Sequence, residues 1–151
     1  MQKKWVLITG VSSGIGFQIA NDLLEKGYFV LGVSRSLTRK VEHLKTNHPG
    51  CFVFETLDLV KDIDALPKWV LTKSKELGRF YGFVHSAGVQ QIVPLQVNTY
   101  GHMREIFDLN VFSGLALAKG IADKRVMNVQ GGSVVFISSI ASKQGKAGLV
   151  N

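Results

Sequence analysis

Three glycines near the N-terminus are spaced as in a loop that binds phosphate. Gly10, Gly14 and Gly16 lie in the run Thr9-Gly10-Val11-Ser12-Ser13-Gly14-Ile15-Gly16, between an apolar run and a helical pattern. Glycines remove side chains, so the backbone can turn tightly and approach a pyrophosphate, to which the following helix presents unpaired N–H groups and about half a positive charge. The pattern predicts dinucleotide binding; a plain glycine-rich turn between a strand and a helix is the alternative.

A basic residue follows the second apolar run. At the end of the second strand, an NAD-binding protein is expected to place a carboxylate on the adenosine 2′-hydroxyl. This chain has Ser34 there, followed by Arg35 and Ser36. A guanidinium can hold a 2′-phosphate with two charge-assisted hydrogen bonds and can stack on the adenine. Arg35 therefore favours NADP(H) over NAD(H), with an ordinary solvated arginine as the alternative.

Other polar residues stand at ends of apolar runs or in an unusual context. Asp58, followed by Leu59, comes after the third apolar run, where a carboxylate either caps a helix or binds a ligand. His85 ends the fourth run, where it could act as a base, but we interpret it as structural. Asn110 lies inside a helical pattern, although its amide competes with backbone groups there. A functional role and a plain surface position are both open for Asn110.

Apolar runs that indicate strands alternate with helical patterns along the whole chain. This alternation implies right-handed crossovers and a parallel sheet covered on both faces. We expect an α/β fold of the Rossmann type, a doubly wound parallel sheet with about five strands, in a single NADP-binding domain over 1–151. The predicted strands are Trp5–Thr9, Tyr28–Val33, Phe52–Leu57, Phe80–His85 and Ser133–Ser138. The predicted helices are Ile15 to just before Gly27, Leu37–Asn47, Trp69–Leu77 with Pro67 in the first turn, and Arg104–Met127.

The last predicted strand is followed by loop-like residues from Ile140 to Asn151. A parallel sheet that stops there leaves an unpaired edge on its last strand. We therefore expect the sheet to be incomplete at its C-terminal end.

The composition of the chain limits the kinds of molecule that it is expected to bind. The 151 residues are 46% hydrophobic and 19% charged, and the net charge of +7 is scattered rather than clustered, so we expect no nucleic acid partner. No apolar run approaches the roughly 18 residues of a membrane helix, so no membrane association is expected. Cys51 is the only cysteine, which suits a reducing, cytoplasmic setting. The four histidines show no metal-ligand spacing, so no metal is expected.

Taken together, five motifs resemble those of the short-chain dehydrogenase/reductase family. They are Thr-Gly-x3-Gly-x-Gly at Thr9, Asp58-Leu59, Ser86-Ala87-Gly88, Asn110 within Asp108–Val111, and the Ile-Ser-Ser run that ends at Ser139. The family's usual third motif is Asn-Asn-Ala-Gly, so His85 and Ser86 depart from it and replace asparagines that brace the strand. The resemblance spans Trp5 to Asn151, and the segment also looks like bacterial 3-oxoacyl-carrier-protein reductases.

The resemblance implies hydride transfer between NADP(H) and a small-molecule carbonyl or secondary alcohol. It implies that Ser139 donates a hydrogen bond to the substrate oxygen and stabilises alkoxide charge, although a serine pair capping a turn is the alternative. It implies that Asn110 disturbs its helix and helps to hold a water in a proton relay. The residues expected on the cofactor are Gly10, Ser12, Ser13, Gly14, Ile15, Gly16, Ser34, Arg35, Ser36, Asp58, Leu59, Ser86, Ala87 and Gly88.

In this family the serine is followed by a tyrosine that donates the proton and by a lysine that lowers the tyrosine's pKa. Both positions would fall beyond Asn151, so we expect the 151 residues alone to be inactive. The alternative is a non-catalytic dinucleotide-binding sensor or interaction module. The resemblance also implies a homo-oligomer, a dimer or tetramer built around the long helix Arg104–Met127.

Overall fold

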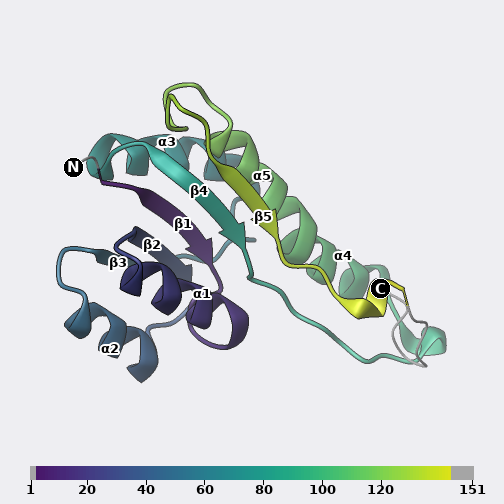
Figure 1. The fold of residues 1–151 in the computed structure, drawn as a ribbon. Helices are drawn as coiled ribbons and strands as arrows, with labels where there is room; N and C mark the ends of the chain where they lie inside the picture. The colour runs from purple at the N-terminus through teal and green to yellow at the C-terminus, as the bar shows by residue number, and fades with distance from the viewer. Residues whose placement is uncertain (1–2, 144–151) are drawn as a thin grey trace.

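Five parallel strands form one sheet in the order β3-β2-β1-β4-β5 in the computed structural model, which describes residues 3–143 apart from the side chain of Ser142 (Figure 1). The pairs β1–β2, β2–β3, β1–β4 and β4–β5 are all parallel. The predicted α/β Rossmann-type sheet is thus confirmed. The strands are β1 Trp5–Thr9, β2 Phe29–Ser34, β3 Phe52–Thr56, β4 Phe80–His85 and β5 Ser133–Phe136.

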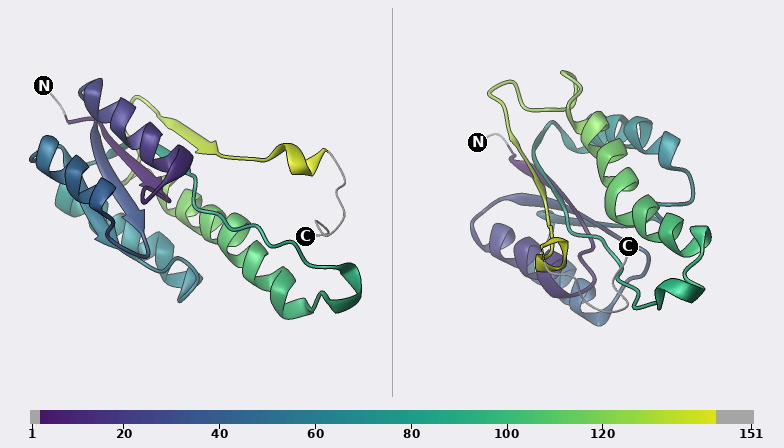
Figure 2. Two further views of the ribbon diagram at one scale, coloured as in Figure 1. Left: turned by 90° about the horizontal axis from the view of Figure 1, so that it is seen from below. Right: turned by 90° about the vertical axis from the view of Figure 1, so that its right-hand side faces the viewer.

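Helices cover both faces of this sheet, as the end-on view in Figure 2 shows. On one face lie α1 (Gly14–Glu25) and α2 (Arg39–Asn47), and on the other lie α3 (Leu66–Leu77) and α5 (Ser113–Ile121). The helix α4 (Tyr100–Phe107) leads into α5 through a π-helical turn, η3 (Asp108–Phe112). Three short 3₁₀ turns are η1 (Ile63–Ala65), η2 (Leu95–Val97) and η4 (Ile140–Ser142).

The strand β1 shows why the sheet is covered on both sides. Successive side chains of a strand point to opposite faces. Trp5 and Leu7 pack into the hydrophobic cluster that includes residues of α3 and α5, whereas Val6 and Ile8 pack into the cluster that includes residues of α1 and α2. All four are buried, so an unbroken apolar run is what this central strand requires.

The long C-terminal helix differs from its prediction. It begins at Tyr100 rather than Arg104, because Thr99 caps it by accepting a hydrogen bond from the backbone N–H of His102. Its helical part ends at Ile121 rather than Met127, because the Asp123 carboxylate accepts from the Arg125 backbone N–H and closes a turn. The predicted helix is also not continuous, since η3 interrupts it around Asn110.

The edge strand β5 is shorter than predicted and poorly covered. It ends at Phe136 rather than Ser138, and Val134, Val135, Phe136 and Ile137 are between 38% and 44% exposed. Its backbone pairs with β4 and with no other strand of the described chain. Residues 140–142 form a 3₁₀ turn rather than the predicted loop, and the rest of that prediction lies outside the described residues.

Two aspects of the fold bear directly on function. The carboxyl ends of β1, β2 and β4 point to the same edge of the sheet, where ligands bind in open α/β folds at the point where the strand order reverses. Within residues 3–143, no helix is both long and apolar enough to cross a membrane.

Candidate functional site

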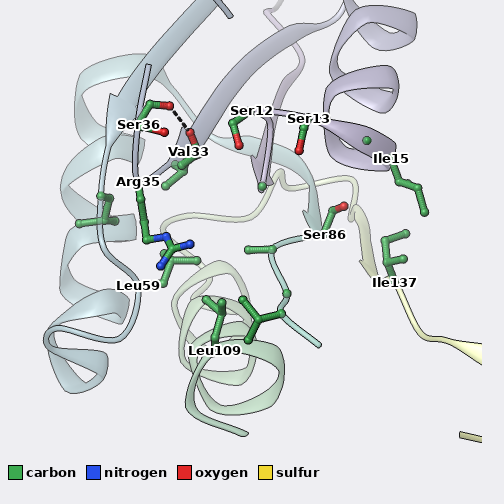
Figure 3. A pocket seen from close by; sticks show the side chains of 17 residues that line it. Ser12, Ser13, Ile15, Val33, Arg35, Ser36, Leu59, Ser86, Leu109 and Ile137 are labelled. Atoms are coloured by element: carbon green, nitrogen blue, oxygen red, sulfur yellow. Dashed lines mark hydrogen bonds between the residues drawn. The ribbon is translucent and has the colours of Figure 1, made fainter. Parts of the chain in front are cut away.

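A cavity of about 400 Å³ lies where β1, β2 and β4 end (Figure 3). Figure 3 shows Ser12 and Ser13 in the loop before α1 and Ile15 in the first turn of α1, with Arg35 and Ile137 on opposite sides of the cavity. Twelve of the predicted cofactor residues line it: Gly10, Ser12, Ser13, Gly14, Ile15, Ser34, Arg35, Ser36, Leu59, Ser86, Ala87 and Gly88. Gly16 and Asp58 do not line it, and neither do Asn110 and Ser139.

The glycine loop fits closely against the turn after β4. A Cβ on Gly10 would lie 2.8 Å from the backbone nitrogen of Ala87, and a Cβ on Gly16 would collide with the carbonyl oxygen of Gly10. Gly10 and Gly14 also have positive φ angles of 74° and 58°, which side chains disfavour. Gly16 is therefore needed for the loop to close behind the cavity, although it does not line it.

The start of α1 is open toward the cavity. Its N-cap residue, Ser13, has an extended backbone and makes no side-chain capping hydrogen bond, and no acidic residue lies in the first turn. The first N–H groups of a helix have no partner within the helix, so they attract an anion. Ser13, Gly14 and Ile15 line the cavity at this point, and the arrangement suits the pyrophosphate of a dinucleotide.

Arg35 is the cation of the cavity wall. Its side chain extends from the end of β2 toward Leu59 (Figure 3), and none of the ion pairs within residues 3–143 involves it. The neighbouring Ser34 hydroxyl donates to the Ser36 carbonyl oxygen at 2.9 Å. The Thr38 hydroxyl donates to the Ser12 carbonyl oxygen at 3.3 Å and ties the start of α2 to the glycine loop. This corner thus offers positive charge and hydroxyl groups.

Asp58 is exposed, and its carboxylate accepts a hydrogen bond from the backbone N–H of Val60 at 3.1 Å. This bond closes a local turn rather than capping a helix, because the next helical turn, η1, has Asp62 as its N-cap. The adjacent Leu57 and Leu59 line the cavity instead, and Leu59 is buried. Apolar side chains therefore form the wall that follows β3.

The turn after β4 is held by the hydroxyl of Thr9. This oxygen accepts hydrogen bonds from the backbone N–H groups of Ser86 at 3.2 Å and Ala87 at 3.1 Å. The His85 Nδ1 lies 2.9 Å from the same hydroxyl, and burial lowers the pKa of His85. His85 is thus a buried structural histidine, as interpreted from the sequence, and it braces the strand end that the family's asparagines brace.

The two predicted catalytic residues lie at the margins of the cavity. The Asn110 amide, carried by η3, hydrogen-bonds the backbone of Val89, which lines the cavity. Ser139 is exposed and forms the N-cap of η4, where its Oγ accepts from the backbone N–H of Ala141 at 3.1 Å. The turn-capping alternative for Ser139 is therefore also realised in this structure.

Five lining residues were not among the predicted cofactor residues: Val33, Leu57, Val89, Leu109 and Ile137. All five are aliphatic and carry no chemical signal of their own. Their neighbours in the chain are predicted site residues, so proximity to a motif was the only signal that could have found them. Leu109 differs from the other four residues because it lies within the predicted helix. It lines the cavity from the π-turn η3.

The model of the short chain dehydrogenase family matches residues 4–151. Farnesol dehydrogenase of Aedes aegypti is 35% identical over 147 residues, which cover 91% of this chain and 57% of that protein. The vibriobactin-specific 2,3-dihydro-2,3-dihydroxybenzoate dehydrogenase of Vibrio cholerae serotype O1 is 28% identical over 140 residues, covering 91% of this chain and 53% of that protein.

Solved structures agree with these relatives. A short-chain dehydrogenase from Streptomyces avermitilis superposes with a TM-score of 0.86 at 29% identity, covering 98% of this chain and 53% of the other. ElxO with NADP bound superposes with a TM-score of 0.84 at 28% identity, covering 99% of this chain and 60% of the other. The chain spans about half the length of the relatives that it matches.

Proposed function

Because the chain belongs to the short-chain dehydrogenase family, we propose that it binds NADP(H) in the cavity at the ends of β1, β2 and β4 and serves hydride transfer to or from a small carbonyl or secondary alcohol. The observation that carries the cofactor choice is Arg35, which extends into the cavity without an ion-pair partner in the described chain. Similarity to ElxO, whose structure holds NADP, supports the same choice.

Each wall of the cavity has a binding role in this proposal. The N–H groups at the start of α1 hold the pyrophosphate, and Gly10 and Gly16 let the backbone approach it. Arg35 holds the 2′-phosphate, because a guanidinium pairs with two phosphate oxygens at once. The small residues Ala87 and Gly88 leave room for the nicotinamide-side ribose. Bound NADP(H) supplies or accepts the hydride.

The chain's own contribution to the reaction is a hydrogen-bond donor. Ser139 lies beyond the end of β5, and we assign its hydroxyl to the substrate oxygen, where it stabilises developing negative charge. Asn110 acts through its backbone clamp on Val89, which shapes the cavity. None of the three tyrosines, Tyr28, Tyr81 and Tyr100, lines the cavity, so we propose that these 151 residues alone bind cofactor without turnover.

The relatives do not favour the non-catalytic alternative, since those named above are dehydrogenases. Their names do not point to 3-oxoacyl-carrier-protein substrates either, so the substrate proposal stays at a carbonyl or secondary alcohol. A reducing, cytoplasmic setting remains part of the proposal on the single Cys51 alone.

We also propose that the protein is a homo-oligomer joined along the long helix. Apolar side chains gather on its outer side, where Phe107, Val111, Phe112 and Leu115 are all exposed. Such a surface marks a protein contact. In this proposal residues 1–151 form a single domain that carries both this surface and the cofactor cavity.

Titration with NADPH and with NADH, followed by nucleotide fluorescence, tests the cofactor proposal. NADPH should bind the chain at least tenfold more tightly than NADH. The Arg35→Gln variant should lose that preference, because it loses the charge that the 2′-phosphate requires; Arg39→Gln, an exposed basic residue outside the cavity, is the matched control. Equal affinities for the two nucleotides would refute the NADP assignment.

A further inference from the structure

His85 connects three segments of the chain beside the candidate site, next to the lining residue Ser86. It ends β4 and is 3% exposed. Its Nδ1 lies 2.9 Å from Oγ1 of Thr9 at the end of β1, and its Nε2 lies 3.1 Å from the carbonyl oxygen of Leu109 in η3. The two ring nitrogens therefore face two different elements, and both of these elements border the cavity.

The partners of the imidazole determine where its proton sits. The Thr9 oxygen already accepts from the N–H groups of Ser86 and Ala87, so its own hydrogen is left to donate to Nδ1. The Leu109 carbonyl can only accept, so Nε2 must carry the ring proton and donate it. The Ser113 hydroxyl donates to the same carbonyl oxygen at 2.7 Å. A neutral ring with Nε2–H satisfies every one of these groups.

The surroundings of the ring suit a neutral imidazole. A Cβ on Gly114 of α5 would lie 2.7 Å from Cδ2 of His85, so the glycine makes room for the ring. The rings of Phe83 and Phe136 lie 6.1 Å and 5.6 Å from it. The described neighbours of the ring come from β1, η3, α5, β4 and β5, and none of them is titratable: Thr9, Leu109, Gly114, Phe83 and Phe136. Asp108, which is next to Leu109 in the chain, pairs with Arg104.

Protonation of this ring would break the arrangement. A second ring proton would turn Nδ1 into a donor, and three donors would then converge on the Thr9 oxygen while its own hydrogen lost its acceptor. A buried polar hydrogen without a partner is costly. Desolvation acts in the same direction and lowers the pKa of His85.

We propose that His85 is a positioning residue that replaces the family's asparagine and sets two parts of the cofactor site at once. Through Thr9 it fixes the turn Ser86–Gly88, and through Leu109 it fixes η3, which carries Asn110 and its clamp on Val89. The contact between these parts and the cofactor rests on the proposed function. The coupling of the two parts by one imidazole rests on the hydrogen bonds alone.

Two substitutions separate the arms of the imidazole. His85→Asn can keep an acceptor near the position of Nδ1, and therefore the Thr9 arm, but it is too short to reach Leu109. His85→Gln can keep a donor near the position of Nε2, and therefore the Leu109 arm, but it places no acceptor at Nδ1. The two variants are matched in chemistry, since both carry a neutral amide.

Amide hydrogen exchange of the whole chain reads each arm directly. In His85→Gln the amides of Ser86 and Ala87 should exchange at least tenfold faster, with Val89 little changed. In His85→Asn the Val89 amide should exchange faster, with Ser86 and Ala87 little changed. NADPH affinity should fall about tenfold in His85→Gln and less in His85→Asn. Equal acceleration at both segments in both variants would overturn the assignment of one ring nitrogen to each segment.

Ring nitrogen NMR of the unsubstituted chain provides a test that does not depend on either variant folding. The His85 ring should be the Nε2–H tautomer and should remain neutral below the pH at which an exposed histidine protonates. An Nδ1–H tautomer, or titration near pH 6.5, would overturn the proposal. Failure of NADPH to bind, with the tautomer and exchange pattern as expected, would instead count against the proposed function only.

Discussion

The side-chain amide of Asn110 forms two hydrogen bonds with the backbone of Val89, one in each direction and both 2.8 Å long. Its Oδ1 accepts from the Val89 N–H, and its Nδ2 donates to the Val89 carbonyl oxygen. The amide thus pairs with the chain as a neighbouring strand would. The π-turn η3 projects it toward the segment that follows Gly88, which explains why a poor helix former stands inside this helix.

This pairing predicts that Asn110→Asp destabilises the protein. The carboxylate keeps the bond from the Val89 N–H but faces the Val89 carbonyl oxygen without a hydrogen to donate. The free energy of unfolding should fall by about 1–3 kcal/mol, and NADPH affinity should fall with it. Urea unfolding and NADPH titration measure the two effects. Asn47→Asp, at an exposed position of α2, is the control and should change both little; equal effects would contradict the role of the clamp.

Charge exchange at the end of β2 should change cofactor preference. In the double variant Ser34→Asp with Arg35→Gln, a carboxylate can accept from the 2′-hydroxyl of NADH and repels the 2′-phosphate of NADPH. NADPH affinity should fall by at least tenfold, while NADH affinity should rise. Calorimetric titration with both nucleotides gives the comparison, and a variant that still prefers NADPH would show that Arg35 does not read the phosphate.

Substitutions at Gly10 and Gly50 can distinguish the cost of backbone strain from the cost of a steric clash. Gly10 and Gly50 have nearly the same φ, 74° and 75°, so alanine strains each backbone by on the order of 1 kcal/mol. A Cβ on Gly50 meets nothing within 4 Å, whereas on Gly10 it meets the Ala87 backbone at 2.8 Å. Gly10→Ala should therefore lose about 1–3 kcal/mol more stability than Gly50→Ala. It should also lose NADPH binding, and similar thermal unfolding of the two variants would count against this packing.

The buried imidazole of His85 should make stability fall in mild acid. Its folded pKa lies below the ordinary value of about 6.5, so between these two values the unfolded chain binds more protons than the folded one. The free energy of unfolding therefore decreases as pH falls from about 6.5 to the folded pKa, by about 1.4 kcal/mol for each pH unit in that window. Urea unfolding at a series of pH values measures this slope. His85→Asn should flatten it, and an unchanged slope in that variant would assign the effect elsewhere.

The exposed side of the long helix predicts self-association. Leu115 is 54% exposed in the apolar surface of α4, η3 and α5, and Leu37 is 47% exposed beyond β2. Leu115→Glu should shift the chain toward monomer in sedimentation velocity at high protein concentration, because burying a carboxylate in an apolar contact is costly. Leu37→Glu is the matched control, and the assembly state should not respond to it. The same sedimentation profile for both variants would place the contact on another face.

The sequence predicts the sheet well because its strands are buried on both sides. The predicted bounds of β1 and β4 agree with the structure, those of β2 are shifted by one residue at both ends, and those of β3 differ by one residue at the C-terminal end. The position of the glycine loop could also be predicted. Close backbone contacts at Gly10 and Gly16 leave no room for a side chain, and the resulting glycine spacing is visible in the sequence. Burial and steric exclusion are the two signals that residue types carry most directly.

Other parts of the site follow from tertiary contacts that no local pattern encodes. The π-turn that brings Leu109 to the cavity depends on the Asn110 clamp and on hydrogen bonds from His85 and Ser113 to the Leu109 carbonyl. Helical spacing alone predicts a continuous helix at this point. The bracing role of His85 likewise needs Thr9, which lies 76 residues away in the sequence.

The strand β5 is poorly covered by the described chain, and the segment that carries Ser139 follows it directly. Its residues are held by the ladder to β4, so its opening costs far less than that of β1, which is sandwiched between two ladders and two apolar layers. Ser139 stands three residues past its end. A surface that packs on Val134 to Ile137 would therefore also order the segment that carries Ser139, so that association would prepare the serine for the role proposed for it.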